Sequence, residues 1–153
     1  CDGLHKFTAS WSNYLKYKNL DLSIYFRGAF GFEIFNIHEF YYGIPGMTSN
    51  VMKTAYTKNA NIKENPLVCD YFIERGDYLK LDMVTIGYTI PLVSKYFDSV
   101  RFSLTGKNLF TLTSFSGVDP STYSTNGLTP GATGSRNYYP TCRQFLAAVQ
   151  IAF

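Results

Sequence analysis

The segment from Arg143 to Phe153 constrains the fold more than any other part of the sequence. Apolar residues recur at alternate positions along it, and no charged residue follows Arg143. A β-strand directs alternate side chains to opposite faces, so this period of two predicts a strand with one apolar face. Its length suits a tilted strand across a bilayer, which needs about 9–11 residues. The segment therefore predicts a membrane-spanning strand that ends on an aromatic residue.

Four earlier segments show the same alternation, which predicts five strands in all. In the segment nearest the middle of the chain, the apolar positions change phase at Met83 and Val84. A shift of one residue exchanges the two faces of a strand. We therefore expect either a β-bulge at this point or a strand that leaves the membrane there. The predicted strands are residues 7–17, 20–30, 78–90, 100–112 and 143–153.

The composition fits membrane strands better than membrane helices. Hydrophobic residues make up 46% of the chain and aromatic residues 18%, yet no stretch approaches the roughly 20 apolar residues that a membrane helix needs. Apolar residues dispersed at alternate positions are typical of an outer-membrane β-barrel. The net charge is only +3 and no stripe of Lys and Arg is present. We therefore expect no nucleic-acid partner, and interpret the aromatic residues as strand and interface residues.

The connections between the predicted strands alternate between short and long. Lys18-Asn19 is a tight turn and residues 91–99 form a short one, whereas residues 31–77 and 113–142 are long. Outer-membrane barrels have short periplasmic turns and longer extracellular loops. The pattern predicts that residues 31–77 and 113–142 are extracellular and that the carboxy-terminus is periplasmic. Within the first loop, Asn36 and Glu39 are spaced as in a capping box, and residues 50–56 look helical.

Five strands cannot span a membrane alone. An open sheet would leave two edges of unpaired backbone groups in hydrocarbon, so only closed barrels are stable there. We therefore expect further strands before Cys1, in preference to several copies that join to close a barrel. The sequence does not say why the chain begins at Cys1. It also leaves open whether Cys69 and Cys142 are bridged, because nothing fixes their distance.

Four groups of segments carry a more specific pattern of residues. They are Tyr17 to Ile24, Phe26 to Gly28 and Phe35-Asn36; Glu74 to Leu81 and Ile86 to Pro91; Arg101-Phe102, Thr105 to Thr111 and Gly117 to Pro120; and Tyr139-Pro140, Arg143 and Phe153. In these segments, which follow in order across nearly the whole chain, the sequence resembles the SusC-type (SusC/RagA-like) family of TonB-dependent outer-membrane transporters. There are two departures: Ser121 stands where the family usually has an acidic residue, and Cys142 is atypical.

The resemblance implies an all-β fold in which this chain supplies the last five strands of an antiparallel transmembrane barrel of roughly 22 strands. It also implies a plug domain with a TonB-contacting segment, neither of which is in this sequence. The implied location is the outer membrane of a Gram-negative, Bacteroidetes-like bacterium. The implied partners are a SusD-like surface lipoprotein, the TonB complex, the barrel assembly machinery and outer-membrane lipid.

The sequence contains no recognisable catalytic or metal-binding constellation. His5 and His38 are isolated, with no Cys, Asp or Glu at the spacing of metal ligands. No nucleophile elbow or phosphate-binding loop is present. We therefore expect no enzyme activity, no catalytic residue, no metal and no cofactor.

Two groups of residues and the last residue are candidates for function. Alternation directs Arg27, Arg101 and Lys107 inward, where they would contact a plug or solvate the lumen rather than line a transport path. The loop residues Tyr41, Tyr42 and Tyr123 offer apolar faces for stacking on sugar rings, although an interface belt or packing between loops explains them as well. The terminal Phe153 is a candidate recognition signal for barrel assembly.

The resemblance therefore implies import of a nutrient too large for porins, such as an oligosaccharide or a peptide, driven through TonB. A passive porin or an autotransporter-type barrel without energy coupling is the alternative. A soluble carbohydrate-binding β-sandwich is a third class, and the unbroken apolar faces of the strands argue against it. The identity of the substrate does not follow from these residues.

Overall fold

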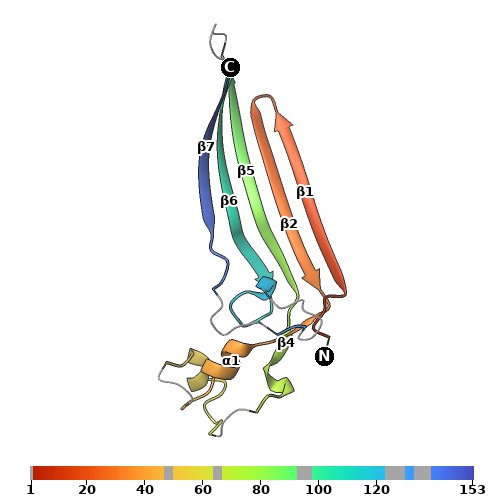
Figure 1. Ribbon diagram of the computed structural model, residues 1–153, viewed down its shortest axis with the longest axis vertical. Coiled ribbons are helices and arrows are strands. Elements are labelled where there is room, and N and C mark those ends of the chain that lie inside the picture. The colour runs from red at the N-terminus through yellow and green to blue at the C-terminus, as the bar shows by residue number, and fades with distance from the viewer. Residues whose placement is uncertain (1, 47–49, 64–66, 93–97, 123–129, 133–138) are drawn as a thin grey trace. The chain divides into compact units, whose positions relative to one another are not determined.

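The computed structural model describes residues 2–46, 50–63, 67–92, 98–122, 130–132 and 139–153. In these residues, five long strands form one sheet and two short strands form another, with little helix (Figure 1). The predicted all-β antiparallel fold is confirmed. The chain divides into two compact units. We call residues 8–28, 79–112 and 141–153 the wall unit, and residues 1–7, 29–78 and 113–140 the loop unit.

The five long strands are the ones that the alternation predicts. Their order in the sheet is β1-β2-β5-β6-β7, and β6 and β7 pair antiparallel from Ser99 opposite Ala152 to Lys107 opposite Gln144. Predicted and observed ranges coincide for the first two strands and differ by a single residue at the ends of the others. The strands are β1 (Phe7–Tyr17), β2 (Leu20–Phe30), β5 (Tyr78–Pro91), β6 (Ser99–Thr113) and β7 (Gln144–Ala152).

The turn between β1 and β2 consists of Lys18 and Asn19. Lys18 has a φ of 53°, in the left-handed region that two-residue hairpin turns use to match the twist of their strands. The backbone carbonyl of Asn19 accepts a hydrogen bond of 2.8 Å from the N–H of Thr89 on β5. The tight turn that the sequence predicts is therefore tied to the neighbouring strand.

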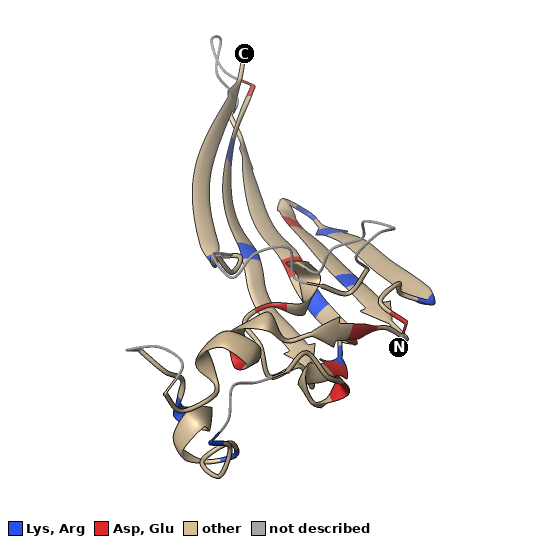
Figure 2. Cartoon of the chain, turned by 60° about the horizontal axis from the view of Figure 1, so that its bottom comes forward, with Lys and Arg blue, Asp and Glu red and all other residues tan. Residues whose placement is uncertain are grey.

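The two faces of the long sheet differ in chemistry. One face, the apolar face, carries large hydrophobic side chains that remain exposed. Charged residues occupy only scattered positions along the strands (Figure 2). Such a surface is unfavourable in water, where contiguous apolar patches of this kind mark a contact with a membrane or a partner. Exposed members from β5, β6 and β7 are Ile86, Tyr88, Phe102, Leu104, Phe145, Val149 and Ile151.

Contacts on the opposite face, the polar face, show that the alternation of side chains between the two faces shifts by one residue within β5. Asp82 of β5 pairs with Arg27 of β2, and Thr85 of β5 bonds Thr105 of β6 through hydroxyl groups 2.9 Å apart. Both partners belong to the polar set of their strands, so Asp82 and Thr85 share this face. Residues three apart in a regular strand lie on opposite faces. A shift of one residue therefore lies between them, where the phase change at Met83 and Val84 predicts a bulge.

The loop unit contains regular structure that the sequence did not indicate. Residues 31–77 were expected to form a loop with short helices, but they include two strands that pair antiparallel, with Ile34 opposite Glu74. The segment expected to be helical from residue 50 to 56 is a 3-10 turn over its last residues only. No helix in the described residues is long and apolar enough to cross a membrane. The elements are β3 (Glu33–Phe35), α1 (Ile37–Tyr42), η1 (Lys53–Tyr56), η2 (Asp70–Phe72), β4 (Ile73–Arg75) and η3 (Pro120–Thr122).

The core of the loop unit forms around the paired strands β3 and β4. Phe32, Ile34, Tyr78, Phe115 and Ala29 make one buried hydrophobic cluster. Gly76 is required beside it, because a Cβ atom there would lie 2.3 Å from the ring of Phe32 and 2.7 Å from Ile34. The core thus joins the chain after β2, the start of β5 and the segment after β6.

The cysteines do not add a cross-link in the described part of the chain. Cys69 and Cys142 are both exposed, and the sulfur of Cys69 belongs to no disulfide. The bridge between these two residues, which the sequence left open, is therefore not formed. Cys1 lies outside the described residues.

Candidate functional site

The polar face of the wall unit is organised by an ion pair between Asp21 of β2 and Arg101 of β6. The Arg101 guanidinium donates to the two carboxylate oxygens of Asp21, at 3.2 Å from Nε and 2.5 Å from Nη2. These strands are not neighbours, because β5 lies between them. The pair crosses β5 at Gly87, where a Cβ atom would lie 2.5 Å from Arg101 Nη2 and 2.6 Å from the Asp21 oxygens. Glycine at this position leaves the space in which the two side chains meet.

A second ion pair holds β2 to β5. Arg27 Nε lies 2.8 Å from Asp82 Oδ2. Nearby on β5, the buried Lys80 donates from its ammonium group to the hydroxyl of Thr141, at 2.8 Å. Arg27, Asp82 and Lys80 therefore each bind another group of the wall.

The residues that the sequence proposed for the lumen lie on this polar face. Arg27 and Arg101 are each held by a carboxylate of the wall itself. Lys107 lies opposite Gln144 in the pairing of β6 with β7, and it is exposed. Two of the three predicted cations therefore have a partner within the sheet.

In the loop unit, Glu74 joins segments that are far apart in the sequence. Its carboxylate accepts hydrogen bonds from the backbone N–H and the hydroxyl of Ser116, at 2.8 and 2.7 Å. It also accepts one from the side-chain amide of Asn36, at 3.1 Å. Burial raises the pKa of the Glu74 carboxyl, but the bonds from Ser116 and Asn36 outweigh burial and hold this pKa below its usual value. Glu74 therefore connects the first long loop to the second as a carboxylate.

Asn36 also begins helix α1. Its side-chain oxygen accepts from the backbone N–H of Glu39 at 3.1 Å, which is the N-cap that the spacing predicts. The reciprocal half of a capping box is not formed, because the Asn36 N–H donates to the carbonyl of Phe72 instead.

The carboxylate of Glu39 serves a buried network that the sequence did not indicate. It accepts from the hydroxyl of Thr54 at 3.0 Å and from the amide of Asn59 at 2.6 Å. Asn59 is fully buried, donates its other amide hydrogen to the carbonyl of Gly43 and accepts from the Tyr71 hydroxyl. The network fixes α1 to the chain between η1 and η2. Only the tertiary fold brings these polar residues together, so no local signal announces them.

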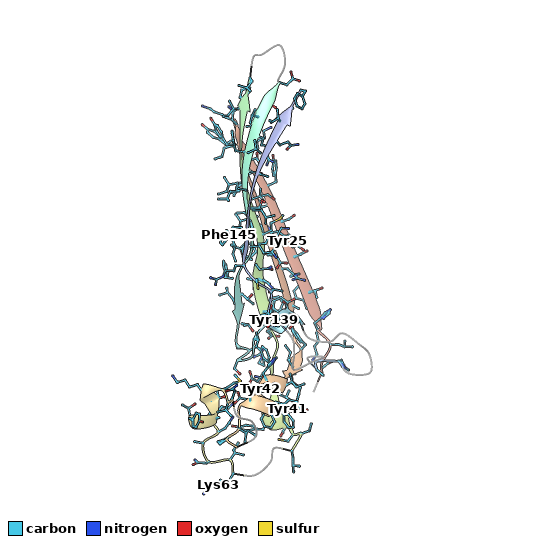
Figure 3. The ribbon with its side chains drawn as sticks, turned by 60° about the vertical axis from the view of Figure 1, so that its left-hand side comes forward. Tyr25, Tyr41, Tyr42, Lys63, Tyr139 and Phe145 are labelled. Carbon is cyan, nitrogen blue, oxygen red and sulfur yellow. The ribbon has the colours of Figure 1, made fainter. Side chains whose placement is uncertain are left out.

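Tyr41 and Tyr42 lie on α1, near its end (Figure 3). Both are partly buried. The Tyr41 ring packs edge-on against Phe40 at a centroid distance of 5.0 Å, and the Tyr42 ring lies 6.4 Å from that of His38. Tyr123, the third aromatic residue proposed for ligand binding, lies outside the described residues. The structure therefore brings two of the three together on one helix, with part of each ring packed.

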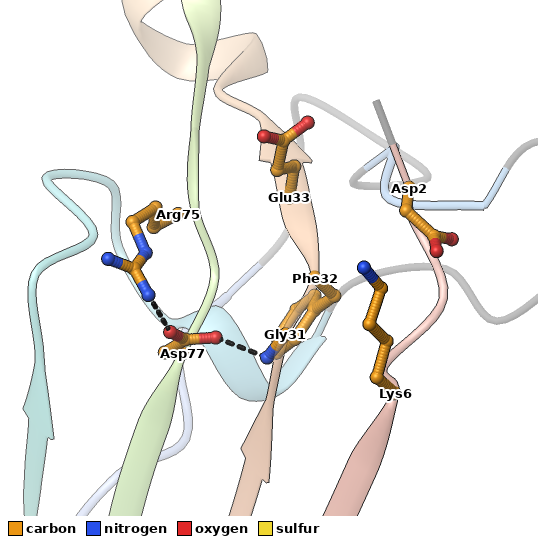
Figure 4. Close-up of a pocket in the computed structure, with 7 residues that line it drawn as sticks. All are labelled: Asp2, Lys6, Gly31, Phe32, Glu33, Arg75 and Asp77. Atoms are coloured by element: carbon orange, nitrogen blue, oxygen red, sulfur yellow. Dashed lines mark hydrogen bonds and ion pairs between the residues drawn. The ribbon is translucent and has the colours of Figure 1, made fainter.

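A polar pocket of about 510 Å³ opens in the loop unit (Figure 4). Asp77 borders it and ties two of its sides, because its carboxylate accepts from the backbone N–H of Gly31 at 2.6 Å and from Arg75 at 2.9 Å. The other lining residues are Asp2, Lys6, Phe32 and Glu33. The described residues contain no group of three or more His, Cys, Asp and Glu side chains placed to hold a metal ion. Charged side chains of both signs therefore border this pocket.

Known proteins resemble this chain in sequence. No family model matches it. TonB-dependent receptor P3 of Formosa agariphila is 29% identical over 126 residues, which cover 74% of this chain and 12% of that receptor. TonB-dependent receptor P26 of the same organism is 28% identical over 166 residues, covering 94% of this chain and 16% of that receptor. The chain therefore spans less than a fifth of the length of these relatives.

Solved structures share the fold. The RagAB peptide transporter superposes with a TM-score of 0.77 at 20% sequence identity, over 99% of this chain and 17% of that one. The RagAB peptide importer in its closed-closed state gives a TM-score of 0.73, also at 20% identity, over 99% of this chain and 18% of that one. The resemblance to SusC-type TonB-dependent transporters is confirmed. Within such a transporter, this chain corresponds to a C-terminal part.

Proposed function

We propose that the complete protein imports a nutrient across the outer membrane with energy from the TonB complex. In this proposal, the chain forms a C-terminal part of the barrel wall and part of the extracellular mouth. The observation that carries the proposal is the two-faced sheet, with exposed apolar side chains on one face and paired charges on the other. Such a division suits a wall between lipid and an aqueous lumen. The similarity to TonB-dependent receptors supports energy coupling and a role without catalysis.

The wall belongs to a closed barrel of roughly 22 strands in this proposal, the size at which plugged transporters occur. Strands β1 and β7 are the edges of the described sheet, and in hydrocarbon other strands must pair with them. The short turns lie in the periplasm with the carboxy-terminus, and the loop unit lies outside the cell. A plug domain fills the lumen and carries the segment that contacts TonB.

The proposed substrate is an oligosaccharide or a peptide too large for porins. The RagAB structures are of a peptide importer, which supports the peptide class for a similar fold. A SusD-like surface lipoprotein covers the mouth by contacting the loop unit. In the loop unit, Glu74 and Asn36 of the first long loop both bind Ser116 of the second, so a partner of this kind would meet the two loops as one surface.

Uptake measurements test energy coupling against the passive alternative. Cells that depend on this protein for a labelled oligosaccharide or peptide are compared with and without a functional TonB complex. We expect loss of TonB to abolish uptake while the amount of barrel in the membrane stays constant. Uptake that continues without TonB would support a passive porin-type or autotransporter-type barrel and contradict the proposal.

Tyr41 and Tyr42 are proposed to contact the substrate or to pack at the mouth, and a paired substitution separates these roles. Replacing both with Ala should raise the substrate concentration needed for half-maximal uptake if they stack on the ligand. Tyr56→Ala is the matched control, because Tyr56 is also in the loop unit and is 73% exposed. Equal effects of the two changes would indicate a packing role for Tyr41 and Tyr42.

We further propose that Lys107 faces the plug, whereas Arg27 and Arg101 face the lumen but serve the wall. This division follows from the ion pairs that hold the two arginines. Lys107→Gln should weaken retention of the plug without lowering the heat resistance of the barrel, and Arg101→Gln should lower the heat resistance. Loss of heat resistance in Lys107→Gln together with weaker plug retention in Arg101→Gln would contradict this division of roles.

A further inference from the structure

Three chain segments meet around the polar pocket of about 510 Å³ in the loop unit. The backbone N–H of Lys6 donates to the carbonyl of Phe30 at 3.1 Å, and the N–H of Glu33 donates to the carbonyl of Asp2 at 2.9 Å. The third segment is β4, which pairs with β3. Main-chain bonds therefore fix the segments that carry the lining side chains, so a ligand would meet a site that is already formed.

The charged side chains that border the pocket are only partly paired with each other. Glu33 on β3 stands directly opposite Arg75 on β4, and oppositely charged side chains in this arrangement attract each other. The Arg75 guanidinium nevertheless lies against the carboxylate of Asp77, at 2.9 Å. Among the described residues, neither Glu33 nor Lys6 belongs to an ion pair. One carboxylate and one ammonium group at the pocket therefore remain available to a ligand.

The two basic side chains of the pocket come from different segments. Figure 4 shows Lys6 and Arg75 on opposite sides of Gly31. Gly31 has a φ of 77°, and a Cβ atom there would lie 3.1 Å from the Cβ of Lys6. A side chain at position 31 would therefore crowd Lys6 and take up space at the border of the pocket.

We propose that this pocket binds a zwitterion, namely a short peptide with a free amino end and a free carboxyl end. The peptide carboxylate binds Lys6 and the Arg75 N–H groups that Asp77 does not use, and the peptide ammonium group binds Glu33. Charge-assisted hydrogen bonds of this kind are stronger than neutral ones, and the volume lies within the range of about 300–1,000 Å³ for small-molecule sites. The inference rests on the proposed function for the extracellular position of the loop unit, and it adds a site and a charge requirement for the peptide class.

The lining favours a zwitterion over a neutral sugar or an ion of one sign. Sugar rings stack on exposed aromatic faces, but Phe32 is only 2% exposed and its ring packs edge-on against Tyr78. A ligand with negative charges alone would be repelled by Glu33, and one with positive charges alone by Lys6. Only a ligand with both charges satisfies both residues.

The test is calorimetric titration of the complete protein, purified from outer membranes in detergent, with dialanine. Dialanine amide lacks the carboxylate and N-acetyl-dialanine lacks the ammonium group, and each should bind about tenfold more weakly than dialanine. Maltose, a neutral disaccharide, should not compete with dialanine. These comparisons need no variant of the protein, so they remain decisive if a variant fails to fold.

Two variants assign the two ends of the peptide to their residues. Lys6→Gln should bind dialanine about tenfold more weakly and lose most of the preference for dialanine over the amide, while the penalty for N-acetylation stays. Glu33→Gln should show the reverse pattern. Lys63→Gln is the matched control, because Lys63 is an exposed lysine of the loop unit that does not line the pocket.

Selective loss of one preference in each variant, with wild-type affinities in Lys63→Gln, supports the proposal. Equal affinities for dialanine and its two capped forms, equal effects of Lys6→Gln and Lys63→Gln, or competition by maltose would each overturn it. Binding is measured without transport, so the two ideas fail separately. TonB-dependent uptake without dialanine binding would remove this site alone, and binding with TonB-independent uptake would remove the proposed function alone.

Discussion

Asp21 of β2 and Arg101 of β6 form an ion pair across β5, the strand that lies between them. Adjacent strands lie about 4.8 Å apart, so their two strands are separated by roughly twice that spacing, with β5 between them. The long guanidinium side chain covers this distance and reaches both carboxylate oxygens of Asp21. It does so over Gly87, the one residue type without a side chain to obstruct it. The ion pair thus fixes three strands of the wall relative to one another.

Replacing Gly87 with Ala should therefore weaken the wall. The new methyl group would lie 2.5 Å from Arg101 Nη2, so the ion pair must separate or the strand must move. Overfilling of this kind costs about 1–3 kcal/mol. We expect the temperature at which the folded barrel loses its altered mobility in a denaturing gel to fall by several degrees.

Gly106→Ala is the control for this change. The atom nearest to a Cβ at Gly106 would be a terminal methyl carbon of Leu109, at 2.8 Å, and this flexible end of the side chain can move aside. The control should keep nearly the heat resistance of the wild type. If Gly87→Ala were as heat-resistant as Gly106→Ala, the ion pair would not be holding the strands together.

Glu74→Gln should loosen the connection between the two long loops. The amide would present a donor where the carboxylate accepts from Ser116 and Asn36, and loss of a partly buried hydrogen bond costs on the order of 1 kcal/mol. Hydrogen exchange should accelerate about tenfold in the segments around residues 74 and 116 and remain unchanged in β6 and β7. Glu33→Gln on the neighbouring strand β3 removes the same charge without touching this network, and should leave the exchange as it was.

The Glu74 carboxyl should make the stability of the loop unit depend on pH. Its pKa in the folded protein is below the usual value of 4.5, so its contribution to stability is complete above that value and is lost as the pH falls through the lower, folded-state pKa. We expect the loop unit to melt at progressively lower temperature as the medium is acidified below about pH 4.5. Glu74→Gln should remove this part of the dependence. An identical pH profile in the wild type and the variant would show that other carboxyls control it.

Asn59→Asp should disrupt the loop unit more than any exposed substitution there. It would place a second carboxylate 2.6 Å from that of Glu39, at a position with no solvent exposure. An uncompensated buried charge costs about 3–5 kcal/mol. Limited proteolysis should then cleave within residues 37–62 at low protease concentrations. Asn61→Asp, which makes the same change at an exposed neighbour, should resist cleavage like the wild type, and equal cleavage of both would contradict the assigned role of Asn59.

The long strands could be predicted from the sequence because their alternation is a local property. Each of the long strands has one apolar face and one polar face. Apolar and polar residues therefore alternate within the strand's own sequence, where the pattern can be recognised without knowledge of the neighbouring strands. The phase change at Met83 and Val84 was visible for the same reason. It is reflected in the contacts of Asp82 and Thr85 with partners on one face.

The site chemistry could not be predicted in this way, because it depends on residues that only the fold brings together. Nothing near Asp21 in the sequence points to Arg101, and the pair also requires the sheet order that puts Gly87 between them. The same holds for Glu39, whose position suggested a capping box but whose carboxylate binds Thr54 and Asn59 instead. The strands β3 and β4 are too short for a period of two to identify them.

The terminal Phe153 provides the last prediction, which concerns assembly rather than transport. Its side chain is 84% exposed, and it follows β7 at the edge of the described sheet, so it contributes little to packing of the wall unit itself. We propose that it is the end that the barrel assembly machinery recognises. Phe153→Ser should lower the amount of folded protein in the outer membrane, measured by the heat-dependent gel shift, while uptake per folded molecule stays normal. Val149→Ser, on the apolar face of the same strand, is a control that removes a comparable apolar group without changing the terminus. Wild-type amounts of the Phe153→Ser variant in the membrane would refute the recognition role.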